Sequence, residues 1–448
     1  MKVVIMAGGK GTRIQSIASD IPKPMIKIDG VPILERELIA LRKQGFKDFI
    51  ITVSHLGNVI MDYFGDGSGC SPVTGEPFGI NIEYYKEENP LGNAGALFKI
   101  RKQLIDDFLL INADALFDVD FNRMVKYHQK KKATLGEKKC VTLFTHPNSH
   151  PYDSGLIVSD NNGVVKEWLT KEDERPLYYK NRVNAGIHII SPEILDDYCI
   201  NPDLLGTTDP QTGKTYKVDL DRQILKPLAG TGRMFCYDSP EYIKDMGTPE
   251  RFYSVEKDFI SGKVQKRNLN NKQKAIFLDR DGTINKYVGF LTNIDEFELV
   301  DGIIDYIKKV NASDYLCIVV TNQPVIARGE VTYAELDEIH NKMETLLGAQ
   351  GAYIDGLYYC PHHPDSGFDG EIKELKYDCD CRKPKPGMLI NAAEDYNIDL
   401  SESWMIGDGK NDILAGKAAK CRTVLIGSED YGQDVTVRDI KELLTYKM

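Results

Sequence analysis

The sequence has no long apolar run. A membrane-spanning helix needs about 18 consecutive apolar residues, and no stretch of this chain approaches that length. The N-terminal run MKVVIMAGG breaks into glycine after only seven residues, so it also lacks the apolar region typical of an export signal. These absences predict a cytoplasmic protein that has no membrane partner.

Excess basic charge is missing as well. The formal net charge is -11, whereas a nucleic-acid-binding protein needs a basic surface, so nucleic acid is not an expected partner. The charge is unevenly placed. From Lys274 onward there are 19 Lys and Arg against 31 Asp and Glu, a net charge of -12, while the preceding part carries +1. The acidity therefore belongs to one half of the chain.

Cysteines are few for a disulfide-held protein. There are nine in 448 residues, and in a reducing compartment they are expected to be thiols or metal ligands. Six of them are scattered singly, and we expect these to be small buried side chains. The six are Cys70, Cys140, Cys199, Cys236, Cys317 and Cys421.

Two α/β patterns follow one another along the chain. Strand-like runs at 3–7, 49–53 and 108–112 alternate with helical patterns near 32–44 and 92–103, and a second set of strands follows at 275–279, 316–322 and 404–408. The stretch 262–273 between the two sets is nearly free of apolar residues. This organisation predicts two domains, 1–261 and 274–448, joined by that linker, each a mostly parallel sheet flanked by helices.

A glycine-rich turn follows the first strand. Its sequence is AGGKGTR, in which Gly8, Gly9 and Gly11 let backbone N–H groups approach a phosphate and Arg13 adds positive charge. Nearby, IPKPM holds Lys23 between two prolines, where a lysine suits the developing charge on a triphosphate. The spacing matches neither the dinucleotide-binding pattern nor the Walker pattern. The turn therefore predicts phosphate binding of another kind.

These segments resemble the sugar-1-phosphate nucleotidylyltransferase family over most of 1–261. The resemblance implies a Rossmann-like domain that transfers a nucleoside monophosphate to a sugar 1-phosphate, with Lys23 and Arg13 as catalytic groups. The residues that it implies for the nucleotide are Gly8, Gly9, Gly11, Thr12, Gly92 and Gly95. It further implies magnesium at Asp114 and Asp245, and sugar binding by Asn184 and Lys171.

Two positions depart from that family's pattern. Ala113 stands where the family usually has glycine, and Thr170 stands where it has glutamate. These departures keep open a different sugar substrate, or a first domain that binds a nucleotide only to regulate the second. Intact Lys23, Asp114 and Asp245 argue against the regulatory alternative.

The second half opens with FLDRDGTIN. Asp279 and Asp281, one residue apart after a strand, place a nucleophile beside a general acid and base, because a carboxylate can attack phosphorus and its neighbour can protonate the leaving alkoxide. This segment and GDGKND at 407–412 resemble the haloacid dehalogenase phosphatase superfamily. The resemblance implies that Thr321, Asn322 and Lys383 bind the phosphate and that Asp279, Asp281 and Asp408 bind magnesium. It places Asp412 in the shell that supports these ligands.

A cysteine- and histidine-rich loop at 360–381 predicts a metal site. Cys360, His362, Cys379 and Cys381 are four soft ligands, which suits a closed, tetrahedral structural zinc site. This loop, together with TNQPVIARG at 321–329, resembles the histidinol-phosphate and heptose-bisphosphate phosphatases, and that resemblance adds Arg328 and Arg382 as phosphate-binding residues.

The fusion suggests two consecutive reactions on small-molecule substrates. Removal of the 7-phosphate from D-glycero-D-manno-heptose 1,7-bisphosphate would leave heptose 1-phosphate, which the first domain would activate, with GTP favoured because SDIPKPM resembles guanylyltransferases. The alternatives are another sugar nucleotidylyltransferase joined to a histidinol-phosphate-like phosphatase, and the regulatory first domain described above.

Overall fold

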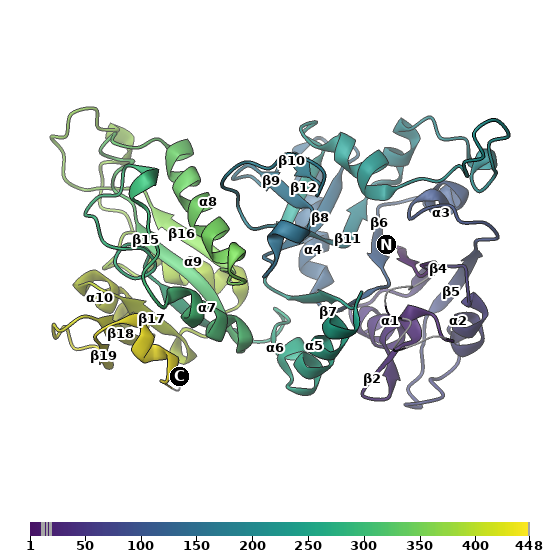
Figure 1. The fold of residues 1–448 in the computed structure, drawn as a ribbon, viewed down its shortest axis with the longest axis horizontal. Coiled ribbons are helices and arrows are strands. Elements are labelled where there is room, and N and C mark those ends of the chain that lie inside the picture. The colour runs from purple at the N-terminus through teal and green to yellow at the C-terminus, as the bar shows by residue number, and fades with distance from the viewer. Residues whose placement is uncertain (10–13, 15–16, 18–19, 447–448) are drawn as a thin grey trace. The chain divides into compact units, whose positions relative to one another are not determined.

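The computed structural model describes residues 1–9, 14, 17 and 20–446, and these divide into two units (Figure 1). The first unit comprises Met1–Thr145, Ile157–Trp168 and Asn184–Asn268, and the second comprises His146–Leu156, Leu169–Val183 and Leu269–Met448. Both consist of sheets with helices packed on them, so the expected α/β class is confirmed. No described helix has both the length and the apolar composition that crossing a bilayer requires.

A nine-stranded sheet, counted over the described residues, runs through the first unit. Its main order is β10-β9-β11-β6-β1-β4-β5, and β8 pairs with β11 and β12. The neighbours β6, β1, β4 and β5 are parallel, whereas β11 is antiparallel to β6. The strands are β1 (Val3–Met6), β4 (Asp48–Val53), β5 (Asn81–Lys86), β6 (Phe108–Asn112), β8 (Val141–His146), β9 (Leu156–Ser159), β10 (Val165–Leu169), β11 (Val183–Ile190) and β12 (Met234–Asp238).

Alternate side chains of these strands build two buried clusters, one on each face. One cluster joins β1 and β6 to α1, α2 and α4, and the other joins them to α3 and a π-helix at Leu220–Leu225. The helices are α1 (Ile33–Lys43), α2 (Gly57–Phe64), α3 (Gly95–Lys99) and α4 (Phe121–Thr134). The helix expected near 92–103 is shorter than that, since α3 is followed by a separate 3₁₀ turn at Arg101–Gln103.

Smaller elements complete the first unit. Two antiparallel pairs form beside the main sheet, β2 (Lys27–Ile28) with β3 (Val31–Pro32) and β7 (Ala115–Asp118) with β13 (Tyr242–Asp245). Thr248 caps α5 (Pro249–Ile260), because its side chain accepts a hydrogen bond from the Arg251 N–H. The stretch expected to be a linker contains α6 (Lys263–Lys266), whose Val264 is buried in one cluster with side chains of α5.

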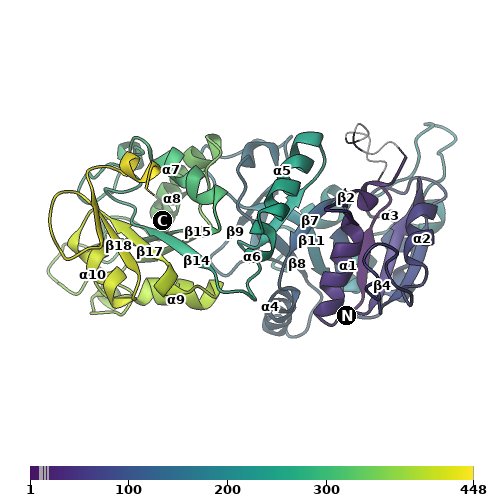
Figure 2. The same cartoon turned by 90° about the horizontal axis from the view of Figure 1, so that it is seen from below.

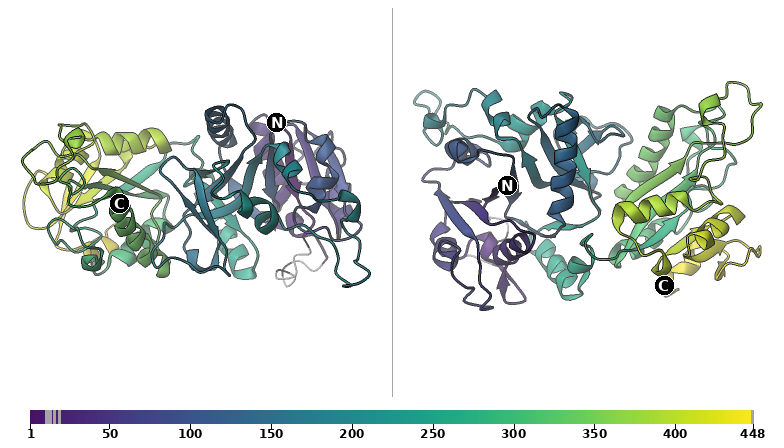
Figure 3. Two further views of the ribbon diagram at one scale, coloured as in Figure 1. Left: turned by 90° about the horizontal axis from the view of Figure 1, so that it is seen from above. Right: turned by 180° about the vertical axis from the view of Figure 1, so that it is seen from behind.

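The second unit has a six-stranded sheet in the order β16-β15-β14-β17-β18-β19, parallel throughout. Its α7 and α8 share one buried cluster with the strands, and α9 and α10 share another. Figure 2 shows these helix pairs on opposite sides of the sheet, and Figure 3 gives further views. The elements are β14 (Lys274–Leu278), β15 (Tyr315–Asn322), β16 (Gly356–Cys360), β17 (Trp404–Gly407), β18 (Arg422–Ile426), β19 (Val435–Val437), α7 (Ile303–Ala312), α8 (Tyr333–Ala349), α9 (Gly387–Tyr396) and α10 (Lys410–Ala418).

Candidate active sites and metal centre

A cavity of about 470 Å³ opens at the carboxyl edge of the first sheet. In parallel sheets, ligands bind where the carboxyl ends of neighbouring strands meet, and the segments after β1, β4, β5 and β6 all contribute here. The cavity is lined by Met6, Ala7, Gly8, Gly9, Ile14, Lys23, Pro24, Thr52, Ser54, Glu87, Pro90, Gly92, Asn93, Asn112, Ala113, Asp114 and Gly247. The structure thus brings Gly8, Gly9, Lys23, Gly92 and Asp114 to one site.

Lys23 is the cationic side chain among the described residues that line this cavity. It begins a 3₁₀ turn, Lys23–Met25, between two prolines, and its Nζ lies 3.2 Å from Oδ2 of Asp114. The lysine side chain is only 10% exposed, whereas that of Asp114 is 50% exposed. A largely buried ammonium beside an accessible carboxylate suits a site for phosphate and a divalent cation.

Asp245 is brought beside Asp114 by strand pairing. β13 pairs with β7 so that Asp245 lies opposite Ala115, and the Met246 N–H donates to the Asp114 carbonyl at 3.0 Å. Both carboxylate oxygens of Asp245 accept hydrogen bonds from Arg251, at 2.9 and 2.8 Å. Burial alone would raise the pKa of Asp245, but Arg251 and the Gly247 N–H hold it below its usual value.

Mg²⁺ is commonly held by one or two carboxylates plus substrate phosphates, and the donor set here matches that chemistry. Asp114 lies in the turn that precedes β7 and Asp245 ends β13, and the carboxylate of each pairs with a cationic side chain. The residues therefore fit a magnesium ion bound together with a triphosphate.

The remaining glycines expected to bind the nucleotide differ in what the structure shows of them. Gly92 has φ +82°, and a Cβ there would lie 2.3 Å from the Val218 carbonyl oxygen, so the position requires glycine. Gly95 is buried at the start of α3 and does not line the cavity. Gly11, Thr12 and Arg13 lie outside the described residues.

The two residues expected to bind the sugar fall in different units. Asn184 is on β11 in the first unit, where its Oδ1 lies 3.1 Å from Nε2 of the buried His188. Lys171 belongs to the second unit, where its Nζ lies 2.6 Å from Oδ1 of Asp153. Neither residue lines the cavity described above.

Lys383 and three aspartates meet at the carboxyl edge of the second sheet. Nζ of Lys383 donates to Asp279 Oδ1 at 2.7 Å, to Asp412 Oδ1 at 2.6 Å and to the Val320 carbonyl at 2.9 Å. Asp279, Asp408 and Asp412 each offer a carboxylate oxygen, and these oxygens lie within 4.8 Å of one another. Three carboxylates against one ammonium leave excess negative charge in this edge of the sheet.

That negative charge is reflected in the pKa values. Burial raises the pKa of Asp279 to about 7, with Lys383 opposing the increase and Asp412 adding to it. Burial and the charge of Asp412 raise the pKa of Asp408 to about 6. Burial alone would lower the pKa of Lys383, but Asp279 and Asp412 hold it above its usual value. A divalent cation would compensate the carboxylates, so the cluster fits Mg²⁺.

Asp281 is held outside this cluster. Its carboxylate accepts hydrogen bonds from Arg280 Nη2 at 2.8 and 2.9 Å, from Asn285 Nδ2 at 3.0 Å and from Gln323 Nε2 at 2.8 Å. Arg280 is fully buried and its Nη1 lies 3.2 Å from Nε2 of His340. The Asp281 carboxyl group is therefore oriented by fixed donors, and the carboxylate cluster contains Asp412 in its place.

Two glycines let these aspartates approach. A Cβ on Gly282, at φ +85°, would lie 1.9 Å from Asp408 Oδ2, and one on Gly407 would lie 2.3 Å from Asp412 Oδ2. The side chain of Asn322 and the backbone of Lys383 exchange two hydrogen bonds of 3.0 Å, which fixes the lysine segment against β15. The Thr321 hydroxyl accepts from Gln323 Nε2 at 2.9 Å, so Gln323, which was not predicted, links Thr321 to Asp281.

Arg328 and Arg382 both contact residues of the cysteine- and histidine-rich loop at 360–381. The Arg328 guanidinium stacks over the rings of Phe290 and Phe368, at 3.9 and 4.2 Å from their centroids. Arg382 Nη1 donates to the His362 carbonyl at 3.2 Å. Both arginines are distinct from the group around Lys383.

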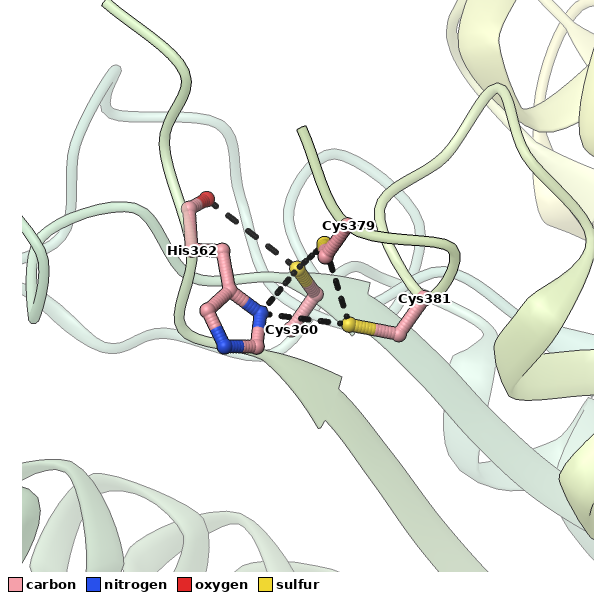
Figure 4. Close-up of side chains that lie close together, drawn as sticks. All are labelled: Cys360, His362, Cys379 and Cys381. Carbon is pink, nitrogen blue, oxygen red and sulfur yellow. Dashed lines mark hydrogen bonds between the residues drawn. The ribbon is translucent and has the colours of Figure 1, made fainter. Parts of the chain in front are cut away.

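The four expected zinc ligands converge on one point (Figure 4). Cys379 Sγ lies 3.4 Å from Cys360 Sγ and 3.2 Å from Cys381 Sγ, and His362 Nδ1 lies 3.3 Å from Cys381 Sγ. A tetrahedron with Zn–S bonds of about 2.3 Å has edges of roughly 3.5 to 3.8 Å, close to these separations. Tyr377 Oη lies 2.8 Å from the other ring nitrogen of His362 and can orient the ring. The group fits a tetrahedral zinc ion.

Crowding of the three thiols perturbs their pKa values. Hydrogen bonding from Cys360 first, with help from Cys379 and His362, lowers the pKa of Cys381 to about 5. The pKa values of Cys360 and Cys379 are raised, that of Cys360 chiefly by its hydrogen bond with Cys381 and that of Cys379 chiefly by burial. A shared cation would allow all three to be thiolates.

Comparison with known proteins finds similar sequences for each of the two halves of the chain. A family model described as nucleotidyl transferase matches residues 2–261, and one described as HAD-hydrolase-like matches 380–442. A D-glycero-beta-D-manno-heptose-1,7-bisphosphate 7-phosphatase of Pasteurella multocida is 46% identical over 155 residues, which is 34% of this chain and 82% of that protein. The corresponding protein of Escherichia coli K12 is 43% identical over 152 residues, 34% of this chain and 78% of that protein.

Solved structures that match the chain include HddC from Yersinia pseudotuberculosis, 25% identical, covering 58% of this chain and 99% of that chain with a TM-score of 0.44. A D,D-heptose 1,7-bisphosphate phosphatase from B. bronchiseptica, complexed with magnesium and phosphate, is 31% identical and covers 38% of this chain and 96% of that chain with a TM-score of 0.34.

Proposed function

The chain belongs to the nucleotidyl transferase family through residues 2–261 and to the family of its heptose-bisphosphate phosphatase relatives through its C-terminal part, and from this double membership we propose one bifunctional enzyme. Its second domain removes the 7-phosphate of D-glycero-D-manno-heptose 1,7-bisphosphate. Its first domain transfers a nucleoside monophosphate, GMP from GTP, to the heptose 1-phosphate and releases pyrophosphate. The observation that carries the proposal is that both candidate sites stand in one chain and that the product of one reaction is a substrate for the other.

In the phosphatase reaction, Asp279 attacks the phosphorus of the 7-phosphate and forms an aspartyl-phosphate while the sugar alkoxide leaves. Asp281 gives the alkoxide its proton and then takes a proton from the water that hydrolyses the intermediate. Lys383, bonded to both Asp279 and Asp412, keeps the nucleophile oriented and offsets negative charge. Mg²⁺ at Asp279 and Asp408 would supply further charge neutralisation at the phosphoryl group.

In the transferase reaction, an oxygen of the sugar 1-phosphate attacks the α-phosphorus of the triphosphate and pyrophosphate leaves. This chemistry depends on position and charge rather than on a proton-transferring base. Gly8 and Gly9 allow the backbone to approach the phosphates, and Lys23 lies where charge develops. We assign Mg²⁺ to Asp114 and Asp245, and the sugar to Asn184 and Lys171.

Several further assignments belong to the proposal. Zinc is structural and is held by Cys360, His362, Cys379 and Cys381. The domains are 1–261 and 274–448, and the change of unit between Asn268 and Leu269 supports a boundary near there. A cytoplasmic location is supported by nine cysteines that form no disulfide. The names of the phosphatase relatives specify the β anomer, so both anomers belong in the assay.

Two variants separate the activities. Lys23→Ala is expected to lower pyrophosphate release about 10²- to 10³-fold and to leave phosphate release unchanged, because it removes one charge-stabilising group from the first site only. Asp279→Asn is expected to abolish phosphate release from the bisphosphate and to leave pyrophosphate release from heptose 1-phosphate and GTP unchanged. Both products are measured by coupled colorimetric assays.

Exposed residues provide matched controls. Lys27→Ala and Asp295→Asn remove the same charges from surface positions of the same two units and are expected to keep both activities. If the wild type forms no pyrophosphate with any nucleotide and several sugar 1-phosphates, the regulatory alternative for the first domain replaces the proposal. If histidinol phosphate is hydrolysed in preference to the heptose bisphosphates, the substrate assignment of the second domain is wrong.

A further inference from the structure

His340 is a buried histidine beside the second site that the reaction described above does not use. It lies on α8, it is 6% exposed, and its ring centroid is 5.5 Å from that of Tyr359 on β16. Its Nε2 lies 3.2 Å from Nη1 of Arg280, the residue between the two aspartates of the FLDRDGTIN motif. The histidine ring therefore contacts the arginine that pairs with Asp281.

Arg280 is a cationic side chain with no exposed surface. Its Nε donates to Asp281 Oδ1 at 3.1 Å, and its Nη2 donates to Oδ1 at 2.9 Å and to Oδ2 at 2.8 Å. These bonds occupy one edge of the guanidinium, and the remaining nitrogen, Nη1, is the one that contacts His340. A buried donor that loses its acceptor costs free energy, because its lost hydration is no longer compensated. His340 therefore stabilises Arg280 in this orientation.

The hydrogen bond between these two side chains has only one possible direction. A guanidinium is always a donor, so Nε2 of His340 accepts, and the ring is neutral with its proton on Nδ1. Burial and the charge of Arg280 hold the pKa of His340 well below its usual value, which agrees with a neutral ring. A carboxylate in this place would compete with Asp281 for the guanidinium. A neutral acceptor holds Arg280 and leaves its positive charge directed at Asp281.

The carboxyl group of Asp281 needs a fixed position, because a general acid must lie within hydrogen-bond reach of the atom that it protonates. Asn285 and Gln323 each donate one hydrogen bond to it, whereas Arg280 donates three. Movement of Arg280 would therefore remove most of the donors that orient the general acid. We propose that His340 is a positioning residue, which holds Arg280 and thereby fixes the carboxyl group of Asp281. This inference rests on the phosphatase reaction proposed above.

The test uses a leaving group that needs no proton. With heptose 1,7-bisphosphate, the bond from phosphorus to O7 breaks as the Asp279 carboxylate forms its own bond to phosphorus, and Asp281 gives its proton to O7. In the analogue in which sulfur replaces O7, a thiolate leaves without that proton, because a thiolate is a much weaker base than an alkoxide. Both rates are measured in a single turnover with the enzyme in excess, by chemical quenching and mass spectrometry of the released sugar. The ratio of the two rates does not depend on the fraction of folded enzyme.

His340→Leu removes the acceptor for Arg280 and keeps a side chain that packs in the core. General acid catalysis contributes roughly 10²- to 10⁴-fold, and this variant is expected to lose about 10- to 100-fold with the oxygen substrate, whereas the rate with the sulfur analogue changes little. His340→Asn, whose shorter amide ends short of Arg280, is a second variant with the same expected result. His340→Gln presents an amide oxygen that can accept from Arg280, so it is expected to recover most of the rate.

Met343→Val is the matched control, because it shortens another buried side chain of α8 in the apolar cluster of the second unit. It is expected to lower the melting temperature and to keep the wild-type ratio of the two rates.

Each outcome separates this inference from the proposed function. An unchanged ratio in His340→Leu and His340→Asn, or a His340→Gln variant as slow as these two with the oxygen substrate, overturns the role of His340 and leaves the phosphatase standing. A wild type that releases sugar from neither the bisphosphate nor its sulfur analogue overturns the proposed phosphatase reaction itself.

Discussion

Among single residues, Glu37 has an unusual environment in the first unit. It lies on α1 and is 1% exposed, and neither of its carboxylate oxygens has a hydrogen-bond partner among the described residues. Burial raises its pKa, the charge of Asp114 raises it further and Lys23 opposes the increase. Glu37 therefore keeps its proton in the folded chain at pH values where it is ionised in the unfolded chain.

This gives Glu37 a pH-dependent cost to stability. Between the unfolded and folded pKa values the folded state binds the additional proton, so the free energy of unfolding falls as pH rises. Glu37→Gln removes that dependence. The melting temperature of the variant minus that of the wild type, measured without divalent cations, is expected to increase from pH 5 to pH 8. A difference that stays constant, as expected for the exposed control Glu88→Gln, would contradict a protonated buried Glu37.

Single residues could be singled out from sequence where their chemistry is encoded by neighbours in the chain. The short spacing of Asp279 and Asp281 and the glycines around them could be interpreted directly, and the structure brings Asp279, Lys383 and Asp408 together. The pairing of Asp281 with Arg280 and Gln323 was not predicted, because it depends on which way the side chains turn after β14 and β15. Glu37 carries no motif, since its significance comes from burial.

At the scale of elements, apolar runs in the sequence located the strands but did not predict which strands pair with one another. The runs at 3–7, 49–53 and 108–112 correspond to β1, β4 and β6, since these strands are buried on both faces and contain few polar residues. The antiparallel position of β11 beside β6 could not be predicted, because it depends on contacts between segments that are distant in sequence. The cysteine-rich loop could be interpreted more fully, because metal ligands have a characteristic residue type and spacing.

Zinc in that loop can be tested by metal analysis. The purified chain is expected to contain one zinc ion, and Cys379→Ser is expected to lose most of it and to melt at a lower temperature, because structural zinc binding contributes to folding free energy. Cys70→Ser, an exposed cysteine of the first unit, is the control and should retain the metal. Equal zinc content in both variants, or none in the wild type, would show that the cluster is not a zinc site.

For the whole molecule, the two units account for the uneven charge of the sequence. The second carries three carboxylates around Lys383, which a divalent cation would balance, whereas the cavity of the first combines Lys23 with a site suited to a triphosphate. That local difference explains only part of the net charge of -11, since most acidic residues of the second half lie on exposed surfaces. The central claim is that one chain performs two consecutive steps.

The most direct test supplies the first substrate and looks for the last product. The wild-type chain is incubated with each anomer of D-glycero-D-manno-heptose 1,7-bisphosphate, Mg²⁺ and GTP, and the products are identified by mass spectrometry. The account predicts GDP-heptose, together with one phosphate and one pyrophosphate for each sugar converted. Accumulation of heptose 1-phosphate with no nucleotide sugar from GTP, ATP, UTP, CTP or dTTP would contradict it, and so would a bisphosphate that remains intact.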